Sequence, residues 1–233
     1  MPLGRKVAEE DICEADVVIY VISRISGEGK DRRKVKGDYY LSEREEEDLR
    51  YLAEMNKPVI LILNAGGPVE LTDILEQTDN IKGILNISQL GQEGGDALAD
   101  VLLGKEVPGG KLTTTWARRY EDYPASEEYG YLNGNLEKEK YKEGIYVGYR
   151  YFDSFDKKVM FPFGFGLSYT MFEMKCCSIN MEESKIRAEV QVTNTGNEYA
   201  GKEVVQIYVT LPQTELEKEY KLSLIHISEP TRP

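Results

Sequence analysis

Two short apolar runs place the strongest constraint on how this 233-residue chain can fold. Residues 17–22 and 59–63 are rich in valine and isoleucine, and runs of this length and composition are typical of buried strands. Between them, Ser42 and Glu45 have the spacing of a helix capping box, and an apolar stripe at helical spacing begins at Leu49. The order strand, helix, strand predicts a βαβ unit and a parallel sheet.

The same pattern continues along the chain. We expect a short helix over residues 69–75, a third strand over 81–87, and a helix over 96–103 that stops at Gly104. The glycine-rich start of that last helix lacks the lysine and hydroxyl of a P-loop, so close packing explains its glycines better than phosphate binding does. Residues 1–120 are therefore predicted to form a partial α/β sandwich with a mostly parallel sheet.

The second half of the chain follows other rules. Residues 121–170 are dense in tyrosine, glycine and proline, and we expect an ordered, aromatic-rich connecting segment because a disordered one would contain fewer aromatics. Apolar residues then alternate with polar ones, which predicts two or three strands of an incomplete antiparallel β-sandwich over 171–221. Residues 222–233 fit neither pattern and are similar to translated sequencing-adapter DNA, so we expect a non-native tail.

Composition excludes several classes of function. The 41 acidic and 29 basic residues give a net charge of −12, which argues against nucleic acid and anionic membranes as partners. Three cysteines, two of them adjacent, and one histidine at position 226 provide neither a disulfide framework nor a metal site, and we expect no cofactor. Residues 1–15 contain no apolar signal-peptide core, so we expect a cytoplasmic protein if Met1 is the true start. Carboxylates are the reactive groups in good supply.

One carboxylate, Glu28, stands out by its position. It lies between Gly27 and Gly29, directly after the predicted strand 17–22, and ligands of parallel α/β sheets bind at the carboxyl ends of strands. A carboxylate there is a candidate general acid/base. Three basic residues are near it in the sequence: Arg24, Lys30 and Arg32. Spacing alone nevertheless favours a solvated turn with an exposed glutamate.

Three groups of segments, taken together and in this order, resemble glycoside hydrolase family 3. They are residues 24–32, residues 91–95 with 108–112, and residues 146–151 with 161–169. The resemblance spans about 15–209 and is greatest to bacterial β-glucosidases. It implies a three-part enzyme with a (β/α)8 barrel, an α/β sandwich and a fibronectin type III-like domain. This chain would contain part of the sandwich and the start of the third domain.

The resemblance also implies roles for residues. Glu28 matches the general acid/base of a retaining enzyme, which needs a second carboxyl group about 5–5.5 Å away. The family's aspartate nucleophile belongs to the barrel, and no segment here resembles its motif, so the implied partners are that barrel and a β-glycoside substrate. The chain by itself would be inactive. Asp31 and Arg32 are expected to shape the loop rather than bind sugar, and the resemblance identifies no substrate-binding residue.

A non-catalytic role is the alternative. The tyrosine-rich residues 129–151 could bind a carbohydrate or a partner protein, because aromatic side chains form platforms for sugars. Burial within the protein is, however, the commoner use of aromatic side chains.

Overall fold

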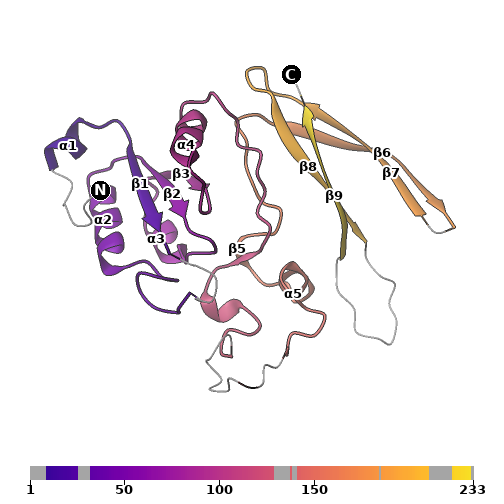
Figure 1. Ribbon diagram of the computed structural model, residues 1–233, viewed down its shortest axis with the longest axis horizontal. Helices are drawn as coiled ribbons and strands as arrows, with labels where there is room; N and C mark the ends of the chain where they lie inside the picture. Colours follow the sequence, from indigo (N-terminus) through magenta and orange to yellow (C-terminus); the bar gives the residue numbers. More distant parts are fainter. Residues whose placement is uncertain are drawn as a thin grey trace. The chain divides into compact units, whose positions relative to one another are not determined.

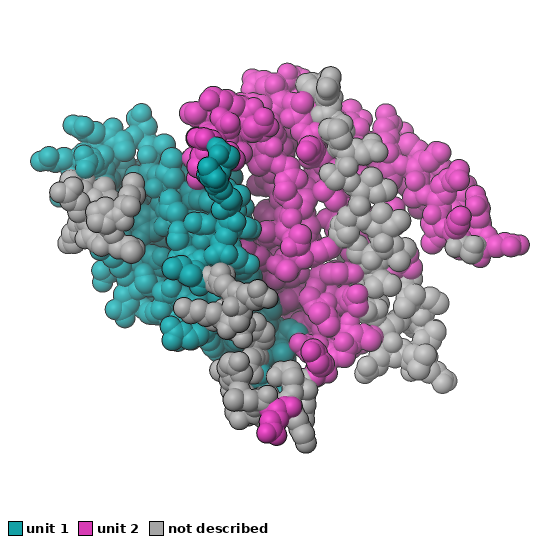
Figure 2. Space-filling view, in the orientation of Figure 1, with its two compact units in different colours: residues 1–93, 118–134 teal, residues 94–117, 135–233 magenta. Residues whose placement is uncertain are grey.

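The computed structural model describes residues 9–25, 32–128, 137, 141–183 and 185–209, and the backbone of 222–231. The chain divides into two compact units (Figure 2). Unit 1 comprises residues 1–93 and 118–134, and unit 2 comprises residues 94–117 and 135–233. Within the described residues, no helix combines the length and apolar character that crossing a membrane requires.

Each unit is described by its own elements (Figure 1). Unit 1 contains α1 (Glu9–Glu14), β1 (Val18–Ser23), α2 (Glu43–Glu54), β2 (Val59–Asn64), α3 (Thr72–Gln77), β3 (Ile81–Asn86) and the 3-10 helix η1 (Tyr120–Asp122). Unit 2 contains α4 (Gly94–Leu102), β4 (Trp116–Ala117), α5 (Tyr149–Ser154), β5 (Val159–Phe161), β6 (Phe172–Glu182), β7 (Lys185–Asn194), β8 (Gly201–Val209) and β9 (Leu222–Thr231).

A three-stranded parallel sheet of order β1-β2-β3 forms the centre of unit 1. The middle strand, β2, is the most buried, and its Val59, Leu61 and Leu63 side chains are almost inaccessible to solvent. The Tyr20 hydroxyl of β1 donates to Asp48 of α2 at 3.1 Å, so this helix packs on the face toward which Tyr20 points. The βαβ prediction is confirmed.

The start of α2 follows the capping chemistry expected from the sequence. The Glu45 amide donates to the Ser42 hydroxyl at 3.2 Å, and the Ser42 amide donates to the Glu45 carboxylate at 2.8 Å. Leu49 and Leu52 on the inward face are buried. The capping box and the apolar stripe together explain why the helix begins here and which side it presents to the sheet.

Two helices have other bounds than expected. The helix expected over 69–75 begins only at Thr72, because Val69 and Leu71 are buried in a non-helical connection whose Glu70 forms an isolated bridge with Tyr40. Within that connection the Glu70 amide donates to the Tyr39 carbonyl at 3.0 Å, which ties the connection to the turn before α2. The helix expected over 96–103 spans Gly94–Leu102, and Gly104 after it has a φ of +70°, a conformation that glycine adopts readily at a helix end.

Residues 118–122 belong to unit 1 and are bound to α3 and the residues before it by hydrogen bonds and ion pairs. Arg119 pairs with Asp73 at 2.5 Å and with Glu70 at 3.2 Å, and the Tyr120 amide donates to Glu70 at 2.9 Å. The Thr72 hydroxyl donates to the Arg118 carbonyl at 2.5 Å. Unit 1 is therefore completed by a segment that follows 24 residues of unit 2 (94–117).

Unit 2 contains two antiparallel hairpins, β6–β7 and β8–β9. Apolar pairs such as Met174 with Val192 and Ile179 with Ala188 share one face of the first hairpin, as the alternating pattern predicts. Residues 222–231 of the expected tail form β9 and pair with residues 201–209, so the structure adds a strand that the sequence did not lead us to expect. A parallel α/β part followed by antiparallel strands is the predicted fold class, and it is confirmed.

Aromatic side chains organise the segment before the hairpins. Trp116 of β4 lies opposite Phe161 of β5 in a short antiparallel pair, and the two ring centroids are 6.0 Å apart. Tyr149 stacks on Phe163 at 4.9 Å. These aromatic side chains thus pack against one another, whereas Tyr141 is exposed and residues 129–136 and 138–140 lie outside the described residues.

Candidate functional site

The candidate site lies at the carboxyl edge of the parallel sheet of unit 1. Glu28 itself, together with Lys30 and Asp31, lies outside the described residues, which stop at Ile25 and resume at Arg32. The structure therefore gives the two ends between which residues 26–31 run. Each end carries one of the arginines singled out in the sequence.

Arg24 fixes the first end. Its side chain is only 4% exposed, and it forms a bidentate ion pair with Glu45 of α2, with nitrogen–oxygen distances of 2.7 and 2.8 Å. The same guanidinium donates to the backbone carbonyls of Asp38 at 2.7 Å, Ser23 at 2.9 Å and Tyr40 at 3.3 Å. All five N–H donors of this arginine are thereby used within the protein.

The backbone of Arg24 is held as well. Its amide donates to the Asn64 carbonyl at 3.0 Å, which extends the pairing of β1 with β2 by one residue. Its carbonyl accepts from the Gln89 side chain at 3.2 Å, and Gln89 belongs to the loop after β3. The loops that follow β1 and β3 are thus joined at the edge of the sheet.

Arg32 fixes the second end. Its Nε donates to the Asp38 carboxylate at 2.9 Å, and its Nη1 donates to the carbonyls of Gly67 at 3.1 Å and Pro68 at 2.6 Å. Its Nη2 donates to the Asp38 carbonyl. The glycine-rich loop after β2, which contains both acceptor carbonyls, is therefore attached to the chain that leaves residues 26–31.

Asp38 links the two ends, because its backbone carbonyl accepts from both arginines. Burial raises the pKa of the Asp38 carboxyl, but the Arg33 amide at 2.7 Å and the Arg32 guanidinium outweigh it and hold that pKa below its ordinary value. Burial likewise raises the pKa of Glu45, and the hydrogen bonds from Arg24 and Ser42 bring it below the ordinary value. Both carboxyls are therefore ionised at neutral pH and neutralise the arginines.

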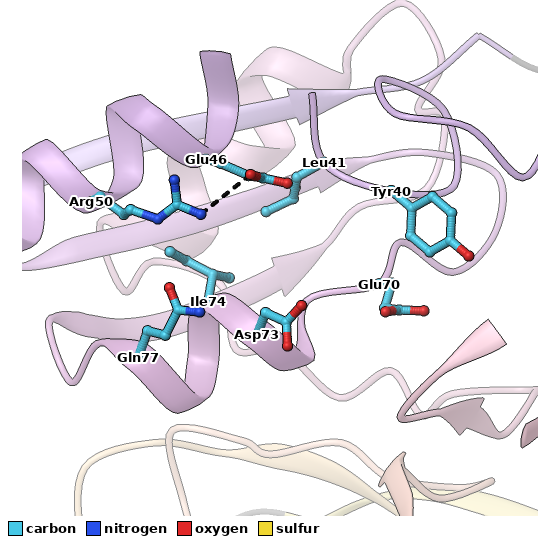
Figure 3. A pocket seen from close by; sticks show the side chains of 8 residues that line it. All are labelled: Tyr40, Leu41, Glu46, Arg50, Glu70, Asp73, Ile74 and Gln77. Atoms are coloured by element: carbon cyan, nitrogen blue, oxygen red, sulfur yellow. Dashed lines mark hydrogen bonds and ion pairs between the residues drawn. The ribbon is translucent and has the colours of Figure 1, made fainter. Parts of the chain in front are cut away.

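A separate pocket of about 100 Å³ lies between α2 and α3 and is lined by Tyr40, Leu41, Glu46, Arg50, Glu70, Asp73, Ile74 and Gln77 (Figure 3). Its charged groups already have protein partners. Glu46 accepts from Arg50 at 3.2 Å, and Arg119 pairs with both Glu70 and Asp73. Burial raises the pKa of Glu70 despite these partners. We assign this pocket a structural role, because two of its carboxylates, Glu70 and Asp73, hold residues 119–120 in place.

The sequence indicated this edge of the sheet but not the hydrogen bonds and ion pairs that join its loops. Asp38, Glu45 and Gln89 were not singled out as loop partners, and each lies at least six residues from the arginine that it contacts. The capping-box glutamate was the one sequence feature that could have drawn attention to Glu45. Among the described residues, no group of three or more histidine, cysteine, aspartate or glutamate side chains is arranged to hold a metal ion.

These features define an α/β protein whose polar loops meet at the carboxyl edge of a parallel sheet, the edge at which such proteins bind ligands. Residues 4–149 match the family model described as the glycosyl hydrolase family 3 C-terminal domain. The chain therefore belongs to glycosyl hydrolase family 3.

Curated relatives and solved structures agree. The chain is 39% identical to β-glucosidase A of Butyrivibrio fibrisolvens over 89% of its length, and 36% identical to a β-glucosidase of Ruminococcus albus over 94%. The structure of β-glucosidase 3B from Thermotoga neapolitana in complex with α-D-glucose superposes with a TM-score of 0.87 at 40% identity, over 95% of this chain. The chain spans 29%, 22% and 31% of these three proteins.

Proposed function

We propose that this chain supplies the general acid/base of a retaining β-glucosidase, and that Glu28 is that residue. The observation that carries the proposal is that both chain ends next to residues 26–31 are anchored at the carboxyl edge of the sheet. Membership of family 3 and similarity to proteins named β-glucosidases support the same role. A carboxylate between two anchored ends can be held at one place relative to a substrate.

The chemistry requires a second protein part. Glu28 would protonate the leaving glycosidic oxygen while a nucleophilic carboxylate attacks the anomeric carbon, and it would then activate the water that releases the sugar. We propose that the nucleophile belongs to a barrel domain of a longer protein that includes this chain. The isolated chain is then expected to hydrolyse no aryl β-glucoside above background.

The decisive experiment replaces Glu28 in that longer enzyme. A general acid matters most for poor leaving groups, so Glu28→Ala should slow cellobiose hydrolysis far more than hydrolysis of a dinitrophenyl glucoside. Azide should partly restore the rate and yield a β-glycosyl azide, because it replaces the base-activated water. Glu47→Ala, at an exposed α2 residue, is the control and should show neither effect. Equal losses on both substrates without azide rescue would make Glu28 structural.

A further inference from the structure

Strand β1 forms an open edge of the parallel sheet of unit 1. Among the described residues, β2 is its only neighbouring strand (Figure 1). The amides of Val18 and Arg24 donate to carbonyls on the β2 side, at 2.9 and 3.0 Å, so the even-numbered residues direct their backbone groups toward β2. Because successive residues of a strand alternate in this respect, the N–H and C=O groups of Val17, Ile19 and Val21 point to the other side. That side is a row of hydrogen-bonding groups that an added strand can satisfy.

The side chains of the same three residues are apolar and about half exposed. Val17, Ile19 and Val21 are 42%, 49% and 52% exposed, and they lie on the face of the sheet away from α2. Residues 17–23 contain no charged residue and no proline, which are the usual means of keeping an edge strand from pairing. Strand β3, at the opposite edge of this sheet, carries the exposed Lys82. The β1 edge therefore lacks a protection that the β3 edge has.

We propose that the β1 edge is an interaction surface for a second copy of this chain, in which the two β1 strands pair antiparallel about a two-fold axis perpendicular to the sheet. Odd-numbered residues then meet odd-numbered residues in hydrogen-bonded pairs. The register that pairs Ile19 with Val21 of the partner subunit aligns residues 17–23 with their own copy along their whole length. The two three-stranded sheets become one continuous sheet. Each open edge satisfies the other, so assembly stops at the dimer.

The residues along and beside β1 agree with this arrangement. Ile19 lies on the same face as its partner Val21 of the partner subunit, and apolar side chains directly opposite each other in an antiparallel pair bury one another. The same register sets Asp16 opposite Arg24 of the partner subunit, whereas parallel pairing would set two aspartates side by side. Since Arg24 is already paired with Glu45, the benefit is the avoided repulsion. The chain spans 22–31% of the relatives named above, so most of the length of such proteins is not available here to cover the edge.

Ile19→Lys is the test variant. The side chain is half exposed, so the folded monomer can accommodate lysine, and in the dimer the lysine places a charge within the paired edge. Ile186→Lys is the matched control, because Ile186 is an isoleucine of β7 that is 51% exposed. This control also tests the other exposed apolar strand surface, that of the β6–β7 hairpin.

The first measurement is sedimentation equilibrium of the whole chain in about 0.15 M salt, which screens the net charge of −12. With a dissociation constant of about 10 µM, the wild-type mass should rise from 26.5 kDa at about 1 µM toward twice that value at about 100 µM. Ile19→Lys should raise the dissociation constant about 100-fold, and Ile186→Lys should leave it within about twofold. A wild-type chain that stays monomeric at about 100 µM refutes the inference. Loss of the dimer in Ile186→Lys but not in Ile19→Lys refutes it as well.

The second measurement needs no variant. Hydrogen exchange of the wild-type chain, resolved by residue, should be about fourfold slower at about 100 µM than at about 1 µM for the amides of Val17, Ile19 and Val21. The Val18 amide, which is bonded on the β2 side at both concentrations, is the internal control and should change less. If a dimer forms while the three amides exchange at an unchanged rate, it uses another surface and the inference fails. If they are protected equally at both concentrations, the chain covers its own edge, which also overturns the proposal.

Discussion

Replacement of Glu45 by alanine tests the energetic importance of the arginine anchor. Glu45 accepts two of the five hydrogen bonds of Arg24, whose side chain is 4% exposed, and its own side chain is 16% exposed. Glu45→Ala would leave a buried guanidinium without its counter-ion, which typically costs about 3–5 kcal/mol. The neighbouring Glu46→Ala removes contacts with exposed Lys36 and Arg50, and such surface pairs contribute only about 0–1 kcal/mol each.

Urea unfolding followed by far-ultraviolet circular dichroism measures the difference in stability between the Glu45→Ala and Glu46→Ala variants. With an m-value of about 1.5 kcal/mol/M, Glu45→Ala should lower the urea midpoint by about 2–3 M, and Glu46→Ala by well under 1 M. The double variant Arg24→Met/Glu45→Ala should lose less free energy of unfolding than the two single variants lose in sum. The reason is that the double variant contains no uncompensated buried charge. The reasoning is refuted if Glu45→Ala costs no more than Glu46→Ala.

Three further predictions concern the core, pH and a helix end. Leu61→Ala in β2, at a fully buried side chain, should cost about 2–5 kcal/mol in urea unfolding, and Ile19→Ala, at a half-exposed one, under about 1.5 kcal/mol. Because the folded-state pKa of Asp38 is lowered, its contribution to stability is present at neutral pH and is lost as pH falls below about 4. Asp38→Asn should therefore reduce the fall in urea midpoint between pH 7 and pH 3, and an unchanged fall would contradict this. Gly104→Ala, at a φ of +70° and with the added Cβ 3.0 Å from a tyrosine hydroxyl, should cost about 1 kcal/mol or more, whereas Gly110→Ala, with open space around it, should melt like wild type.

The parts of the fold that were predictable are those that short sequence windows encode. The β-branched runs became β1 and β2, and the capping box at Ser42 marked the start of α2 within one residue. In each case the structural cause lies within about ten residues, either as apolar periodicity or as a side chain that satisfies a nearby amide. The late start of α3 was missed because Val69 and Leu71 are buried by tertiary packing although neither belongs to a helix.

The hydrogen bonds and ion pairs of the candidate site join residues that are far apart in the sequence. Arg24 meets Glu45 across 21 positions, and Arg32 meets Pro68 across 36. No local pattern distinguishes these arginines from solvated ones, so the sequence could propose Glu28 by resemblance but could not reveal how its neighbours are held. Likewise, Trp116 and Phe161 are 45 residues apart in the sequence, and apolar periodicity could not predict that they pair.

The late return of residues 118–122 to unit 1 has a consequence for synthesis on the ribosome. At about 5–20 residues per second, synthesis of the 33 residues from the end of β3 at Asn86 to Arg119 takes about 2–7 s. During that interval the Glu70 carboxylate, 9% exposed in the finished unit, lacks its ion-pair partner Arg119. A nascent chain stalled at residue 93 should therefore remain sensitive to protease, and a separately added peptide spanning residues 118–128 should protect it.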